Sequence, residues 1–489
     1  MTPGTAKRVR LLIGDDWVEG GAREPATVSS PATGEVVALV EQGSREDVQR
    51  AVESAGAALA PLARMTAFER AALCHKVADA LLGRKEEIAR DLSAEQGKPY
   101  RTEALPEVEV AADMFRDAAE CGKRLDTLVH QSSDAAKRIL TIRQPRGVYG
   151  VITPWNFPVA IPSEYLSAGL ATGNAIVWKP SEWTPLSAAH LAQCFLDAGV
   201  PRGTLNLVLG EPAEVGDEVA ANPGIVAVGL TGSSRTGEIV AQRAAGKPML
   251  LELGGNGPTI VFDDADVEAA VARTAFGSFA NAGQICDSTE RILVQRGVHD
   301  DFVAGLLGEA GKVRLGSPFD EATTMGPLAN EPTASKMDDH VADAVAQGAE
   351  VLAGGVRDDG FPTRLYYQPT VIDGVPPSAK LNIEETFGPV APVLTFGDEE
   401  EALAWANASP LGLLGSVFTR DIGRAMRVAE RLQTGAVNVN ETSAYWQPHT
   451  PVGGFTGKRS GTGRIGGMYT LLEMTQVKMI AIDVGDAAR

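Results

Sequence analysis

The sequence is poor in cysteine and histidine, the residue types that most often form disulfides and metal sites. Its 489 residues include four cysteines and six histidines. The cysteines are far apart, so neither a disulfide framework nor a CxxC metal site is indicated, and a reducing cytoplasm is the expected compartment. No two histidines are spaced like a ligand pair, and we predict no bound metal. The cysteines are Cys74, Cys121, Cys194 and Cys286.

The sequence also lacks long apolar runs and an excess of positive charge. Residues 1–17 hold only a three-residue apolar run before two aspartates, which is too short for a signal peptide, and no stretch is long enough to span a bilayer. The 44 basic and 63 acidic residues give a formal net charge of -19. Nucleic acids and anionic membranes are themselves polyanions, so we expect neither as a partner.

Short apolar runs alternate with helical patterns through the middle of the chain, and this alternation predicts an α/β fold with a parallel sheet. In such a sheet, ligands lie beyond the carboxyl ends of the strands. A second alternation begins after Pro258 and extends to about Gln433, and it predicts a second α/β domain. The strands expected in the first alternation are 147–152, 175–179, 205–209, 225–230 and 249–253.

Several helices and further strands can be placed around these two sheets. Residues 45–122 have the apolar periodicity of helices. Residues 183–198 predict a helix with Thr184 as its cap and Gly199 as its stop. Residues 11–19 predict a hairpin. The ranges 139–144 and 477–483 resemble strands, and a strand so near a chain end is expected to be tied into a sheet.

Cys286 lies between a helical pattern at 267–279, capped by Asp266, and an expected strand at 291–295. We therefore interpret residues 281–290 as an exposed polar loop. An accessible thiol in polar surroundings is a candidate nucleophile. A free cysteine is more often a small core residue, so this position alone does not decide between the two roles.

Three spaced motifs resemble the aldehyde dehydrogenase superfamily. They are TPWNFP at 153–158, LELGG at 251–255 and GQIC at 283–286, and they occur in the family's order and at its usual separations. The resemblance extends from GDDWVEGG at 14–21 to EETFGP at 384–389 and PVGG at 451–454. Three agreeing motifs are far more specific than one.

The resemblance implies a domain organisation. A Rossmann-like NAD-binding domain would comprise residues 1–122 and 147–256, and an α/β catalytic domain residues 257–455. A small β extension made of residues 123–146 and 470–489 would join subunits, so we expect a homodimer or homotetramer.

The resemblance also implies catalytic roles for three residues. Cys286 would add to the carbonyl carbon of an aldehyde. The side-chain amide of Asn156 and the backbone N–H of Cys286 would stabilise the resulting oxyanion. Glu252 would act as the general base that hydrolyses the thioester. Acyl-transferring relatives often lack this glutamate, so its presence favours release of a free carboxylic acid.

The expected cofactor is NAD, with NADP as an alternative. The segment 229–237, GLTGSSRTG, follows an expected strand and precedes a helix, where backbone N–H groups can hold a pyrophosphate. A GxGxxG match at 461–466 lacks a preceding strand, and we interpret it as a flexible loop. A carboxylate at Glu182 would repel a 2'-phosphate. The resemblance implies that the cofactor-binding residues are Thr153, Pro154, Trp155, Lys179, Glu182, Gly232, Ser233, Glu385 and Phe387.

The expected substrate is a small-molecule aldehyde, with a preference for an aromatic one. GQIC followed by STER is similar to members that oxidise benzaldehyde, vanillin or salicylaldehyde. The family commonly has Phe where this chain has Val452, and neighbouring aromatic residues could restore a box for a flat ring. The residues expected in the substrate pocket are Phe157, Ile285, Asp287, Trp446 and Val452.

Two other classes of function remain open at this point. A thiol-dependent esterase or acyltransferase would use Cys286 and Asn156 without redox chemistry, but it would leave Lys179 and Glu182 without a role. A non-catalytic structural protein on the same fold would be expected to have lost Cys286 or Glu252, and this chain has both.

Overall fold

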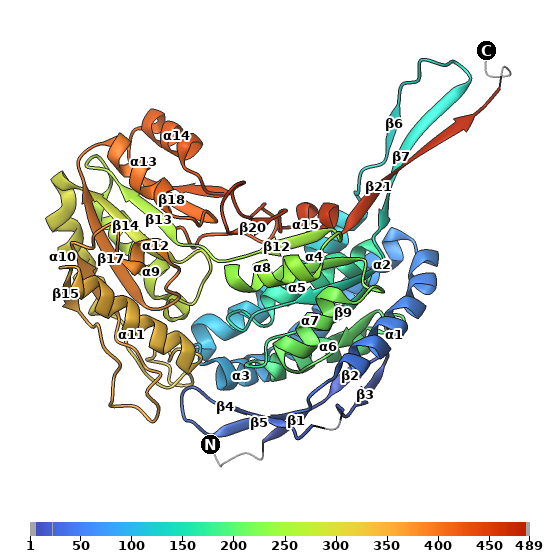
Figure 1. Ribbon diagram of the computed structural model, residues 1–489, viewed down its shortest axis with the longest axis horizontal. Helices are drawn as coiled ribbons and strands as arrows, with labels where there is room; N and C mark the ends of the chain where they lie inside the picture. Colours follow the sequence, from blue (N-terminus) through green and yellow to red (C-terminus); the bar gives the residue numbers. More distant parts are fainter. Residues whose placement is uncertain (1–5, 22, 486–489) are drawn as a thin grey trace.

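The computed structural model describes residues 6–21 and 23–485, and it forms two lobes and a projecting arm (Figure 1). Each lobe is built on its own sheet of predominantly parallel strands, one of eight strands and one of seven. Both alternations expected from the sequence are therefore confirmed, and the fold is α/β. Residues 1–5, 22 and 486–489, which fall within the ranges expected for the cofactor domain and the β extension, lie outside the described residues.

The eight-stranded sheet has five parallel strands at its centre. Its order is β20-β12-β11-β8-β9-β10-β2-β3, and the predicted hairpin of β2 (Leu11–Ile13) and β3 (Asp16–Val18) forms one antiparallel edge. Each of the five central strands coincides with a predicted one to within three residues. They are β8 (Val148–Ile152), β9 (Ala175–Lys179), β10 (Leu205–Leu207), β11 (Ala227–Thr231) and β12 (Met249–Glu252).

Helices cover both faces of this sheet, which explains why its strands read as continuous apolar runs. In β9, Val177 packs in the cluster beneath α1 (Arg45–Arg64), whereas Trp178 packs in the cluster with α2 (Ala67–Gly83) and α6 (Pro185–Ala198). The predicted helical region is completed by α3 (Lys85–Gln96) and α4 (Leu105–Gly122), and α5 (Ala160–Thr172) packs on α4. Among residues 6–21 and 23–485, no helix has the length and apolarity needed to cross a membrane.

The seven-stranded sheet has the order β15-β16-β17-β14-β13-β18-β19, and all its pairings are parallel except β15 with β16. It extends slightly beyond the predicted limit at Gln433, because β19 ends at Val439. Helix α9 (Val267–Phe279) begins at the predicted cap, where the side chain of Asp266 accepts a hydrogen bond from Ala269 N. The strands are β13 (Gly257–Val261), β14 (Thr289–Gln295), β15 (Glu350–Ala353), β16 (Thr370–Asp373), β17 (Val390–Phe396), β18 (Leu414–Phe418) and β19 (Ala436–Val439). The helices that complete the lobe are α10 (His299–Ala310), α11 (Glu331–Ala346), α12 (Lys380–Ile383), α13 (Glu399–Ala408) and α14 (Ile422–Arg431).

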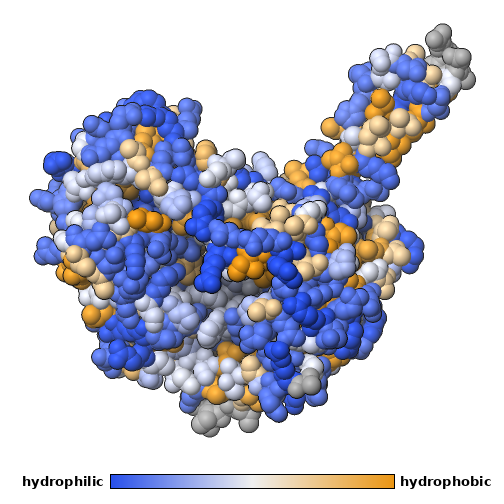
Figure 2. All heavy atoms as spheres, viewed as in Figure 1, coloured by the Kyte–Doolittle hydropathy of each residue, from blue (hydrophilic) through white to orange (hydrophobic). Residues whose placement is uncertain are grey.

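The arm is an antiparallel sheet of β6 (Leu128–His130), β7 (Lys137–Pro145) and β21 (Thr475–Asp483). The two strands predicted near 139–144 and 477–483 are confirmed, and they pair with each other over nine residues, from Thr475↔Pro145 to Asp483↔Lys137. The arm extends away from both lobes, and apolar residues gather on its surface (Figures 1 and 2). They include Leu128, Val129, Val477, Met479 and Ile482. A separate small sheet of β1 (Lys7–Val9), β5 (Val36–Val40) and β4 (Ala26–Ser29) lies near the amino terminus.

Two local expectations were wrong. The Thr184 side chain makes no capping bond at the start of α6; instead, the buried carboxylate of Glu95 accepts hydrogen bonds from Leu186 N and Ser187 N. A carboxylate 91 positions away from Leu186 replaces the local cap, although Gly199 ends the helix in the left-handed conformation as predicted.

The GTGRIG segment at 461–466 is not a flexible loop. Gly461 and Thr462 form β20, which pairs antiparallel with β12 opposite Glu252 and Leu251. Gly461 has φ +116°, and a Cβ there would clash with the carbonyl oxygen of Leu251, only 1.9 Å away. The glycines in this segment therefore permit close approach of two backbones.

Candidate active site

A cavity with a volume of about 700 Å³ lies between the two lobes. Its walls come from α4 and α5 of the first lobe, from α9 of the second, and from the loops around Cys286 and Trp446. Glu252, at the end of β12, and Cys286 both line it. The structure thus brings the expected nucleophile and the expected general base, which are 34 positions apart, to one cavity.

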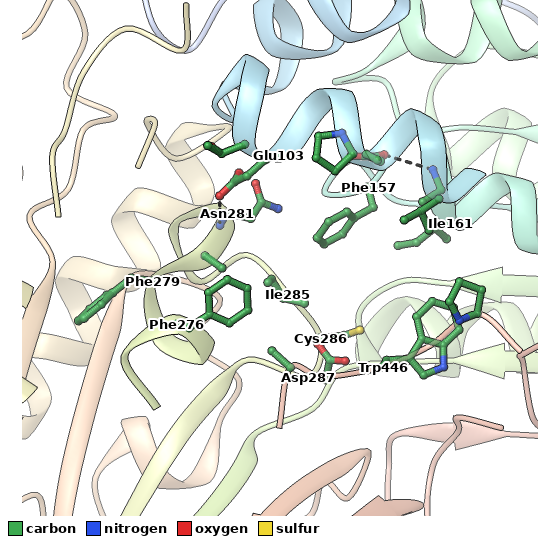
Figure 3. Close-up of a pocket in the computed structure, with 18 of the residues that line it drawn as sticks. Glu103, Phe157, Ile161, Phe276, Phe279, Asn281, Ile285, Cys286, Asp287 and Trp446 are labelled. Carbon is green, nitrogen blue, oxygen red and sulfur yellow. Dashed lines mark hydrogen bonds between the residues drawn. The ribbon is translucent and has the colours of Figure 1, made fainter. Parts of the chain in front are cut away.

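All five residues expected in the substrate pocket line this cavity. Figure 3 shows the Cys286 sulfur between Ile285, Asp287 and Trp446, with Phe157 on the opposite wall. Val452 packs with Trp446 and the Cys286 side chain. Two aromatic residues that the sequence analysis did not single out, Phe276 and Phe279, also line the cavity; both lie on α9.

The loop that carries Cys286 is mostly buried, so its expected exposure was wrong. Apart from Ile285 and Cys286 themselves, which are partly exposed, residues 281–290 are buried. The loop begins with three residues of positive φ, namely Asn281, Ala282 and Gly283. A Cβ on Gly283 would lie 2.1 Å from the carbonyl oxygen of Gly388, so this tight turn requires glycine. Segments distant in sequence cover the loop, which local sequence patterns do not reveal.

Burial and neighbouring carboxylates favour the neutral forms of Cys286 and Glu252. Burial, followed by the charges of Asp287 and Glu252, raises the pKa of Cys286 well above its ordinary value. Burial, followed by the charge of Asp287, likewise raises the pKa of Glu252 well above its ordinary value. Glu252 is 3% exposed, and its Oε1 has no hydrogen-bond partner among the described residues. A buried oxygen without a partner beside a cavity is suited to bind water or a substrate group.

Asn156 lies against the loop that carries Cys286. Its side-chain Nδ2 donates to the carbonyl oxygen of Gln284 at 3.0 Å, and the residue is 2% exposed. The backbone carbonyl of Asn156 accepts from Asn281 Nδ2 at 3.2 Å. These bonds join the TPWNFP turn to the loop that carries Cys286. The position of the Asn156 amide therefore depends on two segments that are more than 120 residues apart in the sequence.

A buried ion pair beneath Asn156 was missed in the sequence. Lys98 Nζ donates to Glu107 Oε2 at 2.5 Å and to the carbonyl oxygen of Asn156 at 2.8 Å. The other carboxylate oxygen of Glu107 accepts from Val159 N at 2.9 Å and Ala160 N at 3.2 Å, at the start of α5. The Lys98 ammonium also lies 3.9 Å from the centroid of the Phe157 ring. In the sequence, the only indication of this ion pair was Glu107, an acidic residue at an otherwise apolar position of the helical pattern of α4.

The expected cofactor residues gather at the carboxyl ends of the first sheet. Thr153 follows β8, and its Oγ1 accepts from Trp178 Nε1 at 2.9 Å. Lys179 ends β9, is 3% exposed, and pairs with the half-exposed Glu182 at 3.1 Å. Ser233 caps α8 (Ser234–Arg243) by accepting from Thr236 N. A buried lysine, an exposed carboxylate and a helix start at this sheet edge fit a dinucleotide with its ribose hydroxyls and pyrophosphate.

Glu385 and Phe387 reach the same region from the second lobe. Glu385 Oε1 accepts from Gly255 N at 3.1 Å, just beyond Glu252. Phe387 has φ +61°, and its N–H donates to Glu290 Oε1 at 2.6 Å. Its ring packs edge-on against Trp155 with centroids 5.5 Å apart. Glu290, which was not singled out in the sequence, therefore holds this strained turn.

Comparison with known proteins agrees with this arrangement. Residues 17–480 match the sequence pattern of the aldehyde dehydrogenase family. The chain belongs to that family. It is an NAD(P)-dependent aldehyde dehydrogenase, an oxidoreductase that acts on the aldehyde group.

Several relatives of this aldehyde dehydrogenase align over nearly its whole length. The succinate-semialdehyde dehydrogenase [NADP(+)] GabD of Escherichia coli K12 is 37% identical over 479 residues, which are 97% of this chain and 98% of the relative. The mitochondrial succinate-semialdehyde dehydrogenase of Arabidopsis thaliana is 39% identical and covers 99% of this chain and 90% of the relative. The crystal structure of succinate-semialdehyde dehydrogenase from Burkholderia pseudomallei superposes with a TM-score of 0.95 at 38% identity, covering 98% of both chains.

A structure solved with a cofactor is also similar. Betaine aldehyde dehydrogenase from Staphylococcus aureus, in complex with NAD+, superposes with a TM-score of 0.94 at 34% identity and covers 97% of this chain and 95% of that one. The descriptions of these relatives thus include both cofactors, NADP for the Escherichia coli enzyme and NAD+ for the Staphylococcus aureus structure.

Proposed function

We propose that this aldehyde dehydrogenase oxidises an uncharged aromatic aldehyde to its carboxylic acid, with NAD as the preferred cofactor. The observation that carries the proposal is that Cys286 and Glu252 line one cavity whose other walls are predominantly apolar and include aromatic side chains. The semialdehydes in the names of several relatives carry a second, anionic carboxylate. The charges around this cavity do not suit such a substrate.

The lining of the cavity opposes a negatively charged substrate. Among the described residues that line it, one is basic: Lys312, whose side chain is 72% exposed and already paired with Glu309 at 2.6 Å. Six acidic residues line the same cavity: Glu103, Glu107, Glu164, Glu252, Asp287 and Glu309. Burying a carboxylate without a cationic partner is costly, and nearby carboxylates add repulsion.

The aromatic lining favours a flat, apolar substrate. Phe157, Phe276, Phe279 and Trp446 come from three separate segments and line the cavity. Phe157 and Trp446 lie on two sides of the space beside Cys286, whereas the Phe279 ring is directed away from it (Figure 3). Aromatic rings that pack edge to face or offset-stacked stabilise each other by a modest free energy beyond that of burial alone. Trp446 is held by a hydrogen bond from its Nε1 to the carbonyl oxygen of Thr450 at 3.1 Å. A benzaldehyde-like ring would replace water in this space.

Oxidation begins at the sulfur of Cys286. The thiol releases its proton to solvent water, and the sulfur then forms a bond to the aldehyde carbon while the carbonyl electron pair moves to oxygen. Asn156 and the backbone N–H of Cys286 would stabilise that oxyanion. The Asn156 amide already donates one N–H to Gln284, so its second N–H is the one to serve the substrate.

Lys179, Glu182 and Ser233 would hold the adenosine and phosphate parts of NAD, and Glu385 its nicotinamide ribose. When bound, NAD supplies the acceptor for the hydride that leaves the substrate carbon, and a thioester on Cys286 remains. The Glu182 carboxylate would repel a 2'-phosphate, which is the basis for preferring NAD.

Hydrolysis of the thioester needs a base, and Glu252 is the candidate. Its Oε1 is buried without a partner, so it can accept a hydrogen bond from a water beside the thioester. The carboxylate would take a proton as the water attacks, and the carboxylic acid and free thiol would result. Because the pKa of Glu252 is raised, it is a stronger base than an ordinary glutamate once it is ionised.

The test is NADH or NADPH formation with benzaldehyde, hexanal and succinate semialdehyde. We expect the highest kcat/KM for benzaldehyde with NAD and the lowest for succinate semialdehyde. A preference for succinate semialdehyde would overturn the proposed substrate class. Failure with every aldehyde, together with hydrolysis of nitrophenyl esters without NAD, would instead favour a thiol esterase.

We also propose that the arm joins subunits into a homodimer or homotetramer, and that the protein acts in the cytoplasm. Val477 and Met479 lie on one face of β21 and are 59% and 61% exposed. Apolar side chains on a projecting sheet are typical of an interface. Light scattering of the protein and of a Val477→Lys, Met479→Lys variant would measure the number of subunits.

A further inference from the structure

The carboxylate of Asp287 is buried beside the nucleophile without a partner. Asp287 is 8% exposed, directly follows Cys286 and lines the cavity. Its Oδ1 is shielded from solvent and has no hydrogen-bond partner among the described residues. Figure 3 shows its carboxyl group beside the Cys286 sulfur, on the side that faces Trp446.

Such a group is unfavourable in an apolar environment unless something donates to it. An unpartnered buried acceptor costs free energy, and a buried charge costs more. Two other acids of the cavity are compensated. Glu107 pairs with Lys98, and Glu164 accepts from Gly466 N at 2.9 Å and also from Thr470. Asp287 differs from these two acids because, among the described residues, only its own backbone N–H acts on the carboxyl group and Oδ1 has no partner.

Glu103 is the nearest comparison, because its Oε2 also lacks a partner. Its other oxygen accepts from Asn281 N at 2.8 Å, and the charge of Lys98 acts on it. It also lies on the short helical segment Tyr100–Ala104, on the wall away from Cys286 (Figure 3). Glu252 Oε1 also lacks a partner, but Glu252 is the general base proposed above. Asp287 is therefore the remaining unpartnered acceptor close to Cys286.

We propose that Asp287 selects aldehydes that carry a hydroxyl group near the carbonyl, by accepting a hydrogen bond from that hydroxyl. This inference rests on the proposed function, because it assumes that an aldehyde occupies the cavity. On an aromatic substrate the hydroxyl would be a phenol at the ring position that lies next to Asp287. Neighbouring apolar side chains, Ile285 and Trp446, would exclude water from that hydrogen bond.

A hydroxyl fits this acceptor better than an ammonium group does. Burial raises the pKa of Asp287 to about 7, so near neutral pH the carboxyl group is present in both its forms. A hydroxyl can donate to either form, because an unionised carboxyl still has a carbonyl oxygen. An ammonium group would need a permanently ionised partner in an apolar cavity.

The experiment compares each hydroxybenzaldehyde with the methoxybenzaldehyde that carries its substituent at the same ring position. The two substituents have similar electronic effects, but only the hydroxyl can donate. For wild type we expect kcat/KM to be at least about tenfold higher for the hydroxyl compound at one ring position. In Asp287→Leu that ratio should fall close to one. The matched control is Glu103→Gln, which neutralises a cavity acid on the wall away from Cys286 and should keep the wild-type ratio.

The test compares the ratio of kcat/KM for the hydroxyl compound to kcat/KM for the methoxy compound. A substitution at Asp287 also changes the reactivity of the Cys286 thiol, and this change affects all substrates alike. A wild-type ratio near one, or a high ratio retained in Asp287→Leu, would overturn the proposal. A higher kcat/KM for an amino aldehyde than for every hydroxybenzaldehyde would also overturn it. The same holds if the only effect of Asp287→Leu is a higher KM for NAD. If Asp287→Leu does not fold, Asp287→Ala serves as the deletion variant. If wild type oxidised no aldehyde at all, the proposed function itself would fail, which is a different outcome.

Discussion

The ammonium nitrogen of Lys98 lies 2.8 Å from the backbone carbonyl oxygen of Asn156. Because the same ammonium pairs with Glu107, whose other carboxylate oxygen binds two N–H groups at the start of α5, the turn that carries Asn156 is fixed at both ends. Lys98 is not among the residues that line the cavity, although its ammonium lies 3.9 Å from the centroid of the Phe157 ring. It is a positioning residue for the expected oxyanion donor.

Lys98→Met should therefore affect both stability and turnover. Removing one partner of a buried ion pair leaves the other charge uncompensated, which typically costs about 3–5 kcal/mol of unfolding free energy. Misplacing the Asn156 amide should lower kcat more than it changes KM for the aldehyde. Urea denaturation and steady-state kinetics measure the two effects.

A double variant separates positioning from stability. Lys98→Met with Glu107→Gln removes both charges, so it should regain much of the stability without regaining kcat. A double variant with wild-type kcat would show that Asn156 needs no support from Lys98. The surface control is Lys85→Met, which breaks the exposed pair with Glu109 and should leave both quantities nearly unchanged.

Alkylation should report the raised pKa of Cys286. The thiolate is the reactive form, so in cofactor-free protein the rate of Cys286 modification by iodoacetamide should still be rising above about pH 9. Asp287→Asn removes a carboxylate that raises this pKa, so the profile should move to lower pH. Peptide mass spectrometry gives the rate at each cysteine. Cys121, whose pKa is raised to about 11 by burial and Asp117, is an internal control that should not shift.

Cofactor preference should depend on the charge of Glu182. Glu182→Ala removes the carboxylate beside Lys179, and the freed ammonium can then attract a 2'-phosphate. We expect kcat/KM for NADP to rise by about tenfold or more relative to NAD, which corresponds to about 1.4 kcal/mol. Asp79→Ala, an exposed acid on α2, is the control for net charge. An unchanged NADP to NAD ratio in Glu182→Ala would assign the preference to other residues.

The sequence predicted the parts of this protein that local patterns determine. The run 175–179 is apolar throughout because both faces of β9 are covered, and such a run is typical of a parallel strand. Gly199 ended α6 as predicted because its left-handed conformation is a local requirement. The motifs around Asn156, Glu252 and Cys286 were specific enough to indicate the family before any geometry was known.

The parts that were missed depend on contacts between distant segments. Glu95 caps α6 from α3, and Lys98 supports Asn156 from 58 positions away. The burial of the Cys286 loop arises where Gly388 meets Gly283. No periodicity or turn signal encodes such pairs, and an isolated charged residue in a sequence gives no sign of its partner. The unpartnered carboxylate of Asp287 likewise becomes visible only once the residues around it are placed.

Glu252→Gln should separate oxidation from hydrolysis. The amide keeps the size of the side chain but cannot take a proton from water, so the thioester on Cys286 should accumulate. Rapid mixing should show one equivalent of NADH per active site formed quickly, followed by turnover at least about a hundredfold slower than in wild type. In wild type, the steady-state rate should rise with pH as Glu252 ionises, because burial raises its pKa. That rise should be absent in Glu252→Gln if hydrolysis is limiting. A variant with neither a burst nor a slower steady state would mean that another group activates the water.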